Sequence, residues 1–250
     1  MKFENLALIP ARGGSKSIPK KNLVNLGGKP LLAYCLRAIR ECKSINRIIV
    51  STDDTQIGEA AKRYHGEIPF LRPDHLAQDD TSTIAVVDHA LQWLDAQEGY
   101  QPDHVLVVQP TEPFILSNQI DETFELMRER NADSGITMVE VPRTFHPFHV
   151  RHETKSRYLE FDHARQHYQH PNRQSDPKRY AFGNLYWFRT AAFLKEKEME
   201  VGKRVGVLID GLTALDINTP LDLEIAEQLL PLTRKASVAN PARTNKTARS

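Results

Sequence analysis

Short apolar runs alternate with longer amphipathic segments through the first 141 residues, and this alternation constrains the fold more than any other feature. An apolar run without polar alternation is typical of a strand that is covered on both faces. Because such strands pair in parallel through helical crossovers, we expect an α/β fold with a mostly parallel, Rossmann-like sheet and helices on both faces. The expected strands are 6–9, 47–51, 68–71, 104–108 and 134–141, and the expected helices are 30–42, 55–64, 83–97 and 117–130.

The pattern breaks at Pro142, and the chain as far as residue 180 is weakly periodic and rich in histidine. Between Arg143 and Arg179 there are eight Lys or Arg residues against four Asp or Glu, together with six of the ten histidines. We interpret 142–180 as an inserted arm that either faces anions or is simply solvated. Strands are expected again at 184–188 and 205–209 and a helix at 219–230, so the main domain comprises 1–141 and 181–230. The polar segment 231–250 is expected to be a disordered tail.

Composition excludes several classes of protein. No run approaches the roughly 20 apolar residues that a membrane span needs, and the first apolar run is too short for a secretory signal. A net charge of +1 argues against a nucleic-acid partner. Cys35 and Cys42 lie seven residues apart in one expected helix, about 10 Å from each other, which is too far for a disulfide. We therefore expect a protein of the reducing cytoplasm, with no membrane partner.

The loop after the first expected strand carries the clearest chemical signal. It reads Pro-Ala-Arg-Gly-Gly-Ser-Lys from Pro10, and four cations, Arg12, Lys16, Lys20 and Lys21, lie within ten residues. Glycines let backbone N–H groups approach phosphate oxygens, and cations neutralise a triphosphate. In parallel sheets ligands bind where such loops lie, at the carboxyl ends of strands. The alternative is a solvated basic loop with turn glycines, since neither the Walker pattern nor the dinucleotide fingerprint is present.

Several blocks of sequence, in one order, resemble the CMP-sugar synthetases, the cytidylyltransferases of sialic acid and related nine-carbon keto-sugar acids. The resemblance spans about residues 5 to 230. The blocks are Ala7–Lys16, Ile18–Asn22, Val50–Asp54, Phe70–Pro73, Leu76–Thr81, Val108–Pro113 and Asp216–Pro220.

The resemblance implies transfer of CMP from CTP to a keto-sugar acid, with release of pyrophosphate and with Mg²⁺ as cofactor. It implies that Arg12, Lys21 and Asp216 are catalytic. The nucleotide site it implies consists of Ala11, Arg12, Gly13, Gly14, Ser15, Lys16, Lys21, Asn22, Arg72, Thr81 and Thr83. It also implies a homodimer in which the arm packs into the partner subunit.

For the sugar acid, the resemblance implies contacts from Gln109, Arg173, Gln174, Asn184 and Tyr186. An arginine fork on the sugar carboxylate makes chemical sense for Arg173, and it could act across a dimer interface. Structural alternatives stay open: Gln109 as an amide that caps a turn, Tyr186 as a half-buried strand aromatic, and Arg173 as a solvated side chain.

The chain departs from the family pattern at one position. The family's metal site rests on an Asp-x-Asp-Thr block, which here begins at Asp216 and has Asn218 in place of the second aspartate. Magnesium would then be held by Asp216 and the amide oxygen of Asn218, with Asp53 or Asp210 assisting. A catalytically weakened CTP-binding module is therefore an alternative, as is a CMP-3-deoxy-octulosonate synthetase. The Gln-Pro-Thr block at Gln109 favours a nine-carbon acid of neuraminate, legionaminate or pseudaminate type.

A metal site in the arm is a further alternative. His163, His167 and His170 could share one helical face and so imitate a set of metal ligands. The sequence shows no fourth ligand beside them, and the helicity of the segment is weak.

Overall fold

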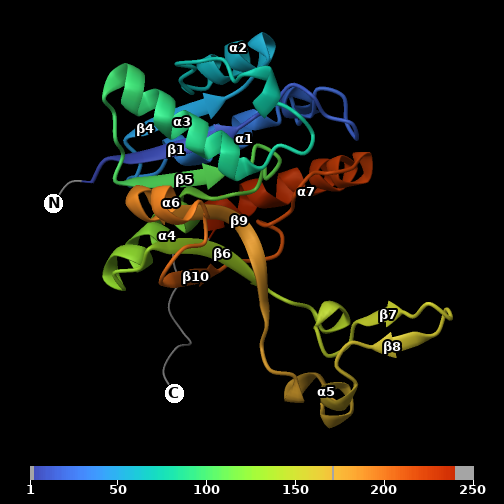
Figure 1. The fold of residues 1–250 in the computed structure, drawn as a ribbon. Helices are drawn as coiled ribbons and strands as arrows, with labels where there is room; N and C mark the ends of the chain where they lie inside the picture. The colour runs from blue at the N-terminus through green and yellow to red at the C-terminus, as the bar shows by residue number, and fades with distance from the viewer. Residues whose placement is uncertain (1–2, 171, 240–250) are drawn as a thin grey trace.

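The computed structural model describes residues 3–170 and 172–239. Its centre is a six-stranded sheet in the order β10-β6-β9-β5-β1-β4 (Figure 1). Parallel pairing joins β1 to β4 and β5, and joins β10 to β6, which confirms the predicted mostly parallel sheet. The strands are β1 (Asn5–Pro10), β4 (Arg47–Ser51), β5 (His104–Val108), β6 (Ser134–Glu140), β9 (Tyr180–Arg189) and β10 (Arg204–Leu208).

Helices cover both faces of this sheet, as the sequence predicts. Ala7 and Ile9 of β1 pack in one core with α1 (Leu32–Arg40), α2 (Thr55–Arg63) and α4 (Ser117–Glu129). Leu6 and Leu8 face the opposite way, into a core with α3 (Thr83–Glu98) and α6 (Thr190–Glu196). Alternate side chains of β1 are thus buried on opposite faces, which explains why its sequence is apolar without interruption.

A third, smaller core lies beside the first loop. Leu26 of the hairpin β2 (Asn25–Leu26) and β3 (Lys29–Pro30) packs with Ile217 and with Leu230 of α7 (Pro220–Ala239). Gly27 has a φ of 54°, and a Cβ there would lie 2.2 Å from a methyl of Leu230, so this turn requires glycine. This core fixes α7 and the segment before it against the loop that follows β1.

β9 is the one strand of this sheet that runs antiparallel, and it lies between β5 and β6. The chain leaves β6, forms the arm, and returns along β9 beside the strand it has just left. The amide of Val141 donates to the carbonyl of Arg179 at 2.8 Å, where the two legs of the arm meet. The unit β6–arm–β9 is therefore a β-hairpin with a very long connection.

The arm has its own small secondary structure and projects from the body (Figure 1). It contains the hairpin β7 (Arg151–Glu153) and β8 (Leu159–Phe161), the helix α5 (Ala164–Gln169), and the 3-10 helices η3 (Arg143–Phe145) and η4 (Arg173–Ser175). Several large apolar side chains on it are more than two-thirds exposed, namely Phe145, Tyr158, Leu159 and Tyr168. The arm contains a hairpin that its weak periodicity did not predict.

Three expectations about secondary structure are wrong, one about a strand and two about the ends of helices. The expected strand at 68–71 is absent, because Pro69 lacks an N–H donor and only Glu67 bridges to β4. The last helix does not end at Leu230 but continues through Pro231 to Ala239, and residues 240–250 of the predicted tail lie outside the described residues. Cys42 follows the end of α1 instead of lying within it, and both cysteines are free thiols.

Within the described residues, every helix is too short or too polar to cross a lipid bilayer.

Candidate active site

The glycine-rich loop is fixed by contacts with the turn after β4 and with the 3-10 helix η1 (Lys21–Leu23). The amide of Gly13 donates to Oδ1 of Asp53 at 2.8 Å, and Asn22 Nδ2 donates to the carbonyl of Arg12 at 2.8 Å. A Cβ on Gly13 would lie 2.8 Å from Cβ of Asp54, so the close approach of the loop to β4 requires glycine. Asp53, expected as a possible aid to the metal, instead positions this loop.

A single carboxylate bridges two cations of the loop. Arg12 Nη1 lies 2.7 Å from Oδ1 of Asp79, and Lys16 Nζ lies 2.5 Å from Oδ2. Hydrogen bonds from Lys16 and Arg12 hold the pKa of Asp79 below its usual range. Gly14 is exposed and a Cβ there would meet no atom within 4 Å, so the outer side of the loop is open to an anion. Sequence reasoning missed Asp79, because nothing local marks a carboxylate 67 residues away as its partner.

Lys21 joins the loop to a segment near the end of the chain. Its Nζ donates to the carbonyl of Ile217 at 3.0 Å and to Oδ1 of Asn218 at 3.2 Å, across 196 residues. Burial lowers the pKa of Lys21, and Arg12 adds to this effect against the opposing charges of Asp216 and Asp222. The predicted catalytic residues Lys21 and Asp216 are thus brought into electrostatic contact.

The two predicted metal ligands are also close together. Asn218 Nδ2 donates to Oδ2 of Asp216 at 2.7 Å, while the amide oxygen of Asn218 faces Lys21. Asp222 Oδ2 accepts hydrogen bonds from the amides of Asn218 and Thr219 and so fixes the turn into α7. In this orientation Asn218 presents nitrogen, and not oxygen, to the carboxylate of Asp216.

Glu112 is a buried acid that sequence reasoning did not single out. Its side chain is 3% exposed, and among the described residues no hydrogen-bond donor reaches its Oε2. Burial, and then the charge of Asp216, raise its pKa well above the usual value. Ile217 N donates to the carbonyl of Thr111 at 2.9 Å, which joins the segment of Glu112 to that of Asp216. A charged residue directly before Pro113 and the apolar run that follows it could have marked this position.

The residues predicted to line the nucleotide pocket lie at the end of β4 and the start of α3. The Arg72 guanidinium is buried and donates to the hydroxyl and carbonyl of Ser51. Burial lowers the pKa of Arg72 to about 10, and Arg12 acts in the same direction. Thr81 is half-buried, and Thr83 is the first residue of α3.

On the sugar side, the structure distinguishes between the predicted residues. Gln109 is half-buried, directly after β5, and the ring of Tyr186 stacks on Phe182 with 4.2 Å between centroids. Asn184 is 1% exposed, accepts from the Thr137 hydroxyl and donates to the carbonyl of Thr213. Asn184 is therefore committed to internal hydrogen bonds, whereas Gln109 and Tyr186 stay partly accessible.

The predicted arm residues lie apart from this cluster. Gln174 is exposed in η4, and the side chain of Arg173 lies outside the described residues. A contact between Arg173 and a sugar acid therefore stays a prediction. His163, His167 and His170 do not converge on one another, because His167 instead contacts His149, at 2.9 Å between Nδ1 atoms.

Comparison with known proteins identifies relatives of this chain. The family model described as cytidylyltransferase matches residues 6–230. The chain is 30% identical to pseudaminic acid cytidylyltransferase of Campylobacter jejuni, over 94% of this chain and 100% of that protein. It is 30% identical to CMP-N,N'-diacetyllegionaminic acid synthase of Legionella pneumophila, over 93% and 99%.

A solved structure of CMP:2-keto-3-deoxy-manno-octonic acid synthetase complexed with CTP has the same fold. Its TM-score is 0.67 at 18% identity, covering 92% of this chain and 99% of that one. The match of the family model over nearly the whole ordered chain, together with the relatives, decides the family. The chain belongs to the cytidylyltransferase family and is a nucleotidyltransferase.

Proposed function

We propose that the protein transfers CMP from CTP to a nonulosonic acid, a nine-carbon keto-sugar acid, and releases pyrophosphate. The observation that carries this proposal is the contact of Lys21 with Ile217 and Asn218. That contact places an ammonium between the glycine-rich loop and the carboxylate of Asp216. A group in this position can neutralise charge that develops on a phosphate held by the loop.

For this reaction the protein mainly has to position the two substrates and neutralise the charge of the phosphates. The anomeric hydroxyl oxygen of the sugar forms a bond to the α-phosphorus and releases its proton. The bond from that phosphorus to the pyrophosphate oxygen breaks, and pyrophosphate leaves with the electron pair. Arg12, Lys16 and Lys21 supply positive charge, and the amides of Gly14 and Ser15 supply N–H groups. Arg72, Thr81 and Thr83 lie where they support recognition of the cytosine.

Mg²⁺ fits this site through Asp216. Magnesium takes oxygen ligands and is commonly held by one or two carboxylates together with substrate phosphates. Asp216 is exposed, and hydrogen bonding engages only one of its oxygens among the described residues. Asn218 would have to turn its amide to become a ligand. Magnesium would neutralise phosphate charge, while Lys21 and Arg12 hold their places independently of it.

The names of the relatives support a nonulosonic acid as the acceptor. Both relatives that are 30% identical over almost their whole length act, by name, on acids of this class. They differ in the acid they take, so the class of acceptor is proposed here and not one member of it.

The test is a matrix of nucleotides and acceptors. The full chain is incubated with Mg²⁺, with CTP or UTP, and with pseudaminic, legionaminic, neuraminic or 3-deoxy-octulosonic acid. We expect pyrophosphate release, and a CMP-sugar by mass spectrometry, with CTP and a nine-carbon acid. Product with only 3-deoxy-octulosonic acid, or no product with any acid, would contradict the proposal. Lys21→Met provides the inactive control.

A second candidate function, a CTP-binding module with weakened catalysis, is favoured by the amide at Asn218. It predicts that calorimetry detects CTP binding while the matrix yields no pyrophosphate. Asn218→Asp, which restores the second carboxylate, should then recover turnover. Turnover by the unaltered chain eliminates this candidate.

We also propose that the protein is a homodimer assembled through the arm. The exposed Phe145, Tyr158, Leu159 and Tyr168 support this, because a concentration of large apolar side chains on a projecting segment favours association. Light scattering after gel filtration should give twice the monomer mass. The double variant Tyr158→Ser, Tyr168→Ser should shift that mass towards the monomer.

A further inference from the structure

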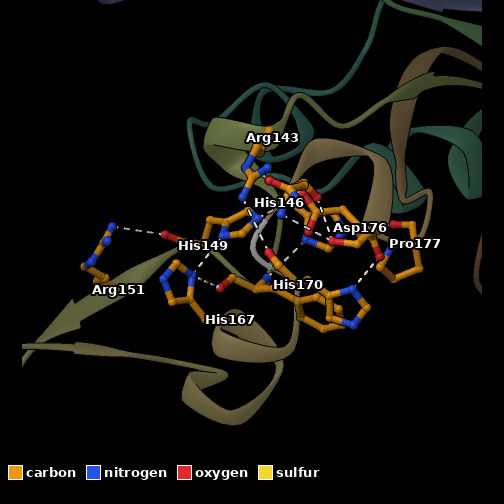
Figure 2. Close-up of polar contacts among 11 residues, drawn as sticks. Arg143, His146, His149, Arg151, His167, His170, Asp176 and Pro177 are labelled. Carbon is orange, nitrogen blue, oxygen red and sulfur yellow. Dashed lines mark hydrogen bonds and ion pairs between the residues drawn. The ribbon is translucent and has the colours of Figure 1, made fainter.

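A cluster of histidines and one aspartate occupies the base of the arm, away from the candidate active site. Figure 2 shows His146 and His149, which follow η3, and Asp176, which precedes β9. Nitrogen and oxygen atoms of these three side chains all lie within 4.8 Å of one another. They come from the two opposite legs of the arm.

The cluster is shielded from solvent although the arm around it is exposed. His146 is 2% exposed, and the side chains of His149 and Asp176 are 9% and 8% exposed. His149 Nε2 lies 3.0 Å from Oδ2 of Asp176. Two nitrogens and a carboxylate at this spacing need only a small contraction to surround a metal ion, since zinc holds such ligands at about 2.0–2.2 Å.

Hydrogen bonds around the two rings show which nitrogen of each can turn to a metal. His146 Nε2 lies 2.9 Å from the carbonyl of Pro177, an acceptor, so this nitrogen carries the proton. The lone pair of Nδ1 accepts from the amide of Phe148 at 3.2 Å, and a metal would take the place of that donor. His149 Nδ1 lies 2.9 Å from Nδ1 of His167, which also faces the carbonyl of Phe148 at 3.2 Å, while His149 Nε2 faces Asp176. In the metal-free protein, Nε2 therefore carries the proton of the neutral ring. Each ring thus resembles a metal-bound histidine in that its second nitrogen is held by a partner outside the metal.

One oxygen of the cluster lacks a hydrogen-bond donor among the described residues. Oδ1 of Asp176 is buried, and no described residue donates a hydrogen bond to it. Buried carboxylate oxygens normally have a partner, because an unsatisfied one costs its full desolvation energy. Arg143 Nε is 3.7 Å away from the other oxygen, Oδ2, and does not supply that partner. A cation between Asp176 and the two histidines would.

We propose that His146, His149 and Asp176 bind a divalent transition metal ion, with zinc as the best fit to two imidazoles and one carboxylate. On binding, the metal takes the place of the proton between His149 Nε2 and Asp176, and that proton moves to Nδ1 of the same ring, so the imidazole stays neutral. His167 acts as a positioning residue, because its Nδ1 contacts Nδ1 of His149, the nitrogen that does not face the metal.

The site would be structural and would hold the two legs of the arm together. The arm has little aliphatic core: both strands of its hairpin are largely exposed, and its interior consists mainly of stacked rings, such as Phe161 on His167 at 3.8 Å. Small modules of this kind commonly depend on a metal or a disulfide. A metal here closes the 27-residue connection from His149 to Asp176. The inference does not depend on the proposed substrate.

Cobalt(II) is the probe, because its visible absorption reports the number of ligands. The full chain is prepared without a histidine tag, stripped with a chelator and titrated with Co²⁺ and then with Zn²⁺. We expect one Co²⁺ per chain with the intense bands of a four- or five-coordinate site, displaced by one Zn²⁺. Hydrogen exchange of residues 143–179 should slow when the metal is bound. Absence of a stoichiometric, intense spectrum in the unaltered chain overturns the proposal.

Variants locate the metal. Asp176→Asn and His149→Gln should each weaken binding about tenfold or more, because each removes a ligand. His152→Gln is the matched control, since His152 forms a similar pair with Asp162 at 2.6 Å but lies on the hairpin without a second histidine. Asp216→Asn checks that the metal is not in the active site. Unchanged affinity in both ligand variants, or an equal loss in His152→Gln or Asp216→Asn, overturns the assignment.

Discussion

Nη1 of Arg12 lies 2.7 Å from Oδ1 of Asp79, so a carboxylate of the chain already forms an ion pair with a cation that a triphosphate would need. The same carboxylate holds Lys16. Both cations must exchange this partner for phosphate when a nucleotide binds. Because the pair is solvent-accessible, the exchange costs little, and Asp79 keeps the two side chains extended in the meantime.

Replacement of Asp79 tests this exchange. Asp79→Asn removes the competing charge while keeping the shape, so we expect the KM for CTP to fall by up to about fivefold, the equivalent of one exposed ion pair. The effect should shrink at high salt, where such pairs are screened. The measurement is initial rate against CTP concentration at two ionic strengths. A higher KM would show instead that Asp79 mainly positions the cations.

Lys21 should matter for catalysis far more than for folding. Lys21→Met keeps the apolar stem but removes the ammonium, and we expect kcat to fall by about 100-fold or more, as for other groups that stabilise developing charge. Denaturation by urea should show little change, because the ammonium forms only two hydrogen bonds at a half-buried position. A large loss of stability with unchanged kcat in the folded fraction would assign a structural role.

Asn218→Asp should alter the dependence on metal. A second carboxylate beside Asp216 increases the negative charge of the site, so half-saturation by Mg²⁺ should occur at a roughly tenfold lower concentration. Manganese binding followed by electron paramagnetic resonance measures this without turnover. Asn218→Ala, which cannot add a charge, is the control. Equal metal affinity in all three proteins would exclude position 218 from the metal site.

Glu112 should destabilise the protein as pH rises. Burial and the charge of Asp216 raise its pKa in the folded state, so its contribution is complete below the unfolded value near 4.5 and is lost as pH increases through the folded value. Glu112→Gln removes this titration. The free energy of unfolding of the variant, relative to the unaltered chain, should therefore increase from pH 4.5 upwards. A difference that is constant with pH would contradict this account.

His104 should act in the opposite direction, on the acid side. The ring is 5% exposed beside Phe3 and Phe124, and burial, with Arg189, lowers its pKa to about 4. Its contribution to stability is complete above about 6.5 and is lost as pH falls towards 4. The loss is about 3 kcal/mol. In urea denaturation, His104→Gln should show a shallower decline over this range, and an identical decline would exclude His104 as its source.

Much of the fold follows from local sequence. The apolar runs of β1, β4 and β5 locate buried parallel strands, and Asp54 accepts from two amides at the start of α2, as an aspartate before a helix commonly does. The direction of β9 could not be predicted, because apolar periodicity is the same for either direction of a strand. The continuation of α7 past Pro231 could not be predicted. A proline indicates a helix end from the neighbouring sequence alone, whereas Ala226 and Leu230 anchor the helix by packing.

The residues of the candidate site also divide into those that the sequence identifies and those that it does not. The resemblance to the CMP-sugar synthetases predicts Lys21 and Asp216, and the glycines and cations of the loop are recognisable in sequence, since they suit an anionic ligand. Asp79 and Glu112 are not, because their roles depend on distance and burial that only the folded chain sets. The same holds for the arm, where the sequence offers His163, His167 and His170 only as an alternative, and where His146 and His149 meet Asp176 across 27 residues or more.

The long hairpin β6–arm–β9 has a consequence for how such proteins diversify. The connection between two adjacent antiparallel strands can change length without rewiring the sheet, and doubling a flexible loop costs only about 0.6 kcal/mol of closure entropy. The arm can therefore be exchanged as a module while β5, β1 and their loops stay intact. Assembly and chemistry can evolve separately in this chain, although the first residues of β9 lie at the same edge of the sheet as the reaction centre.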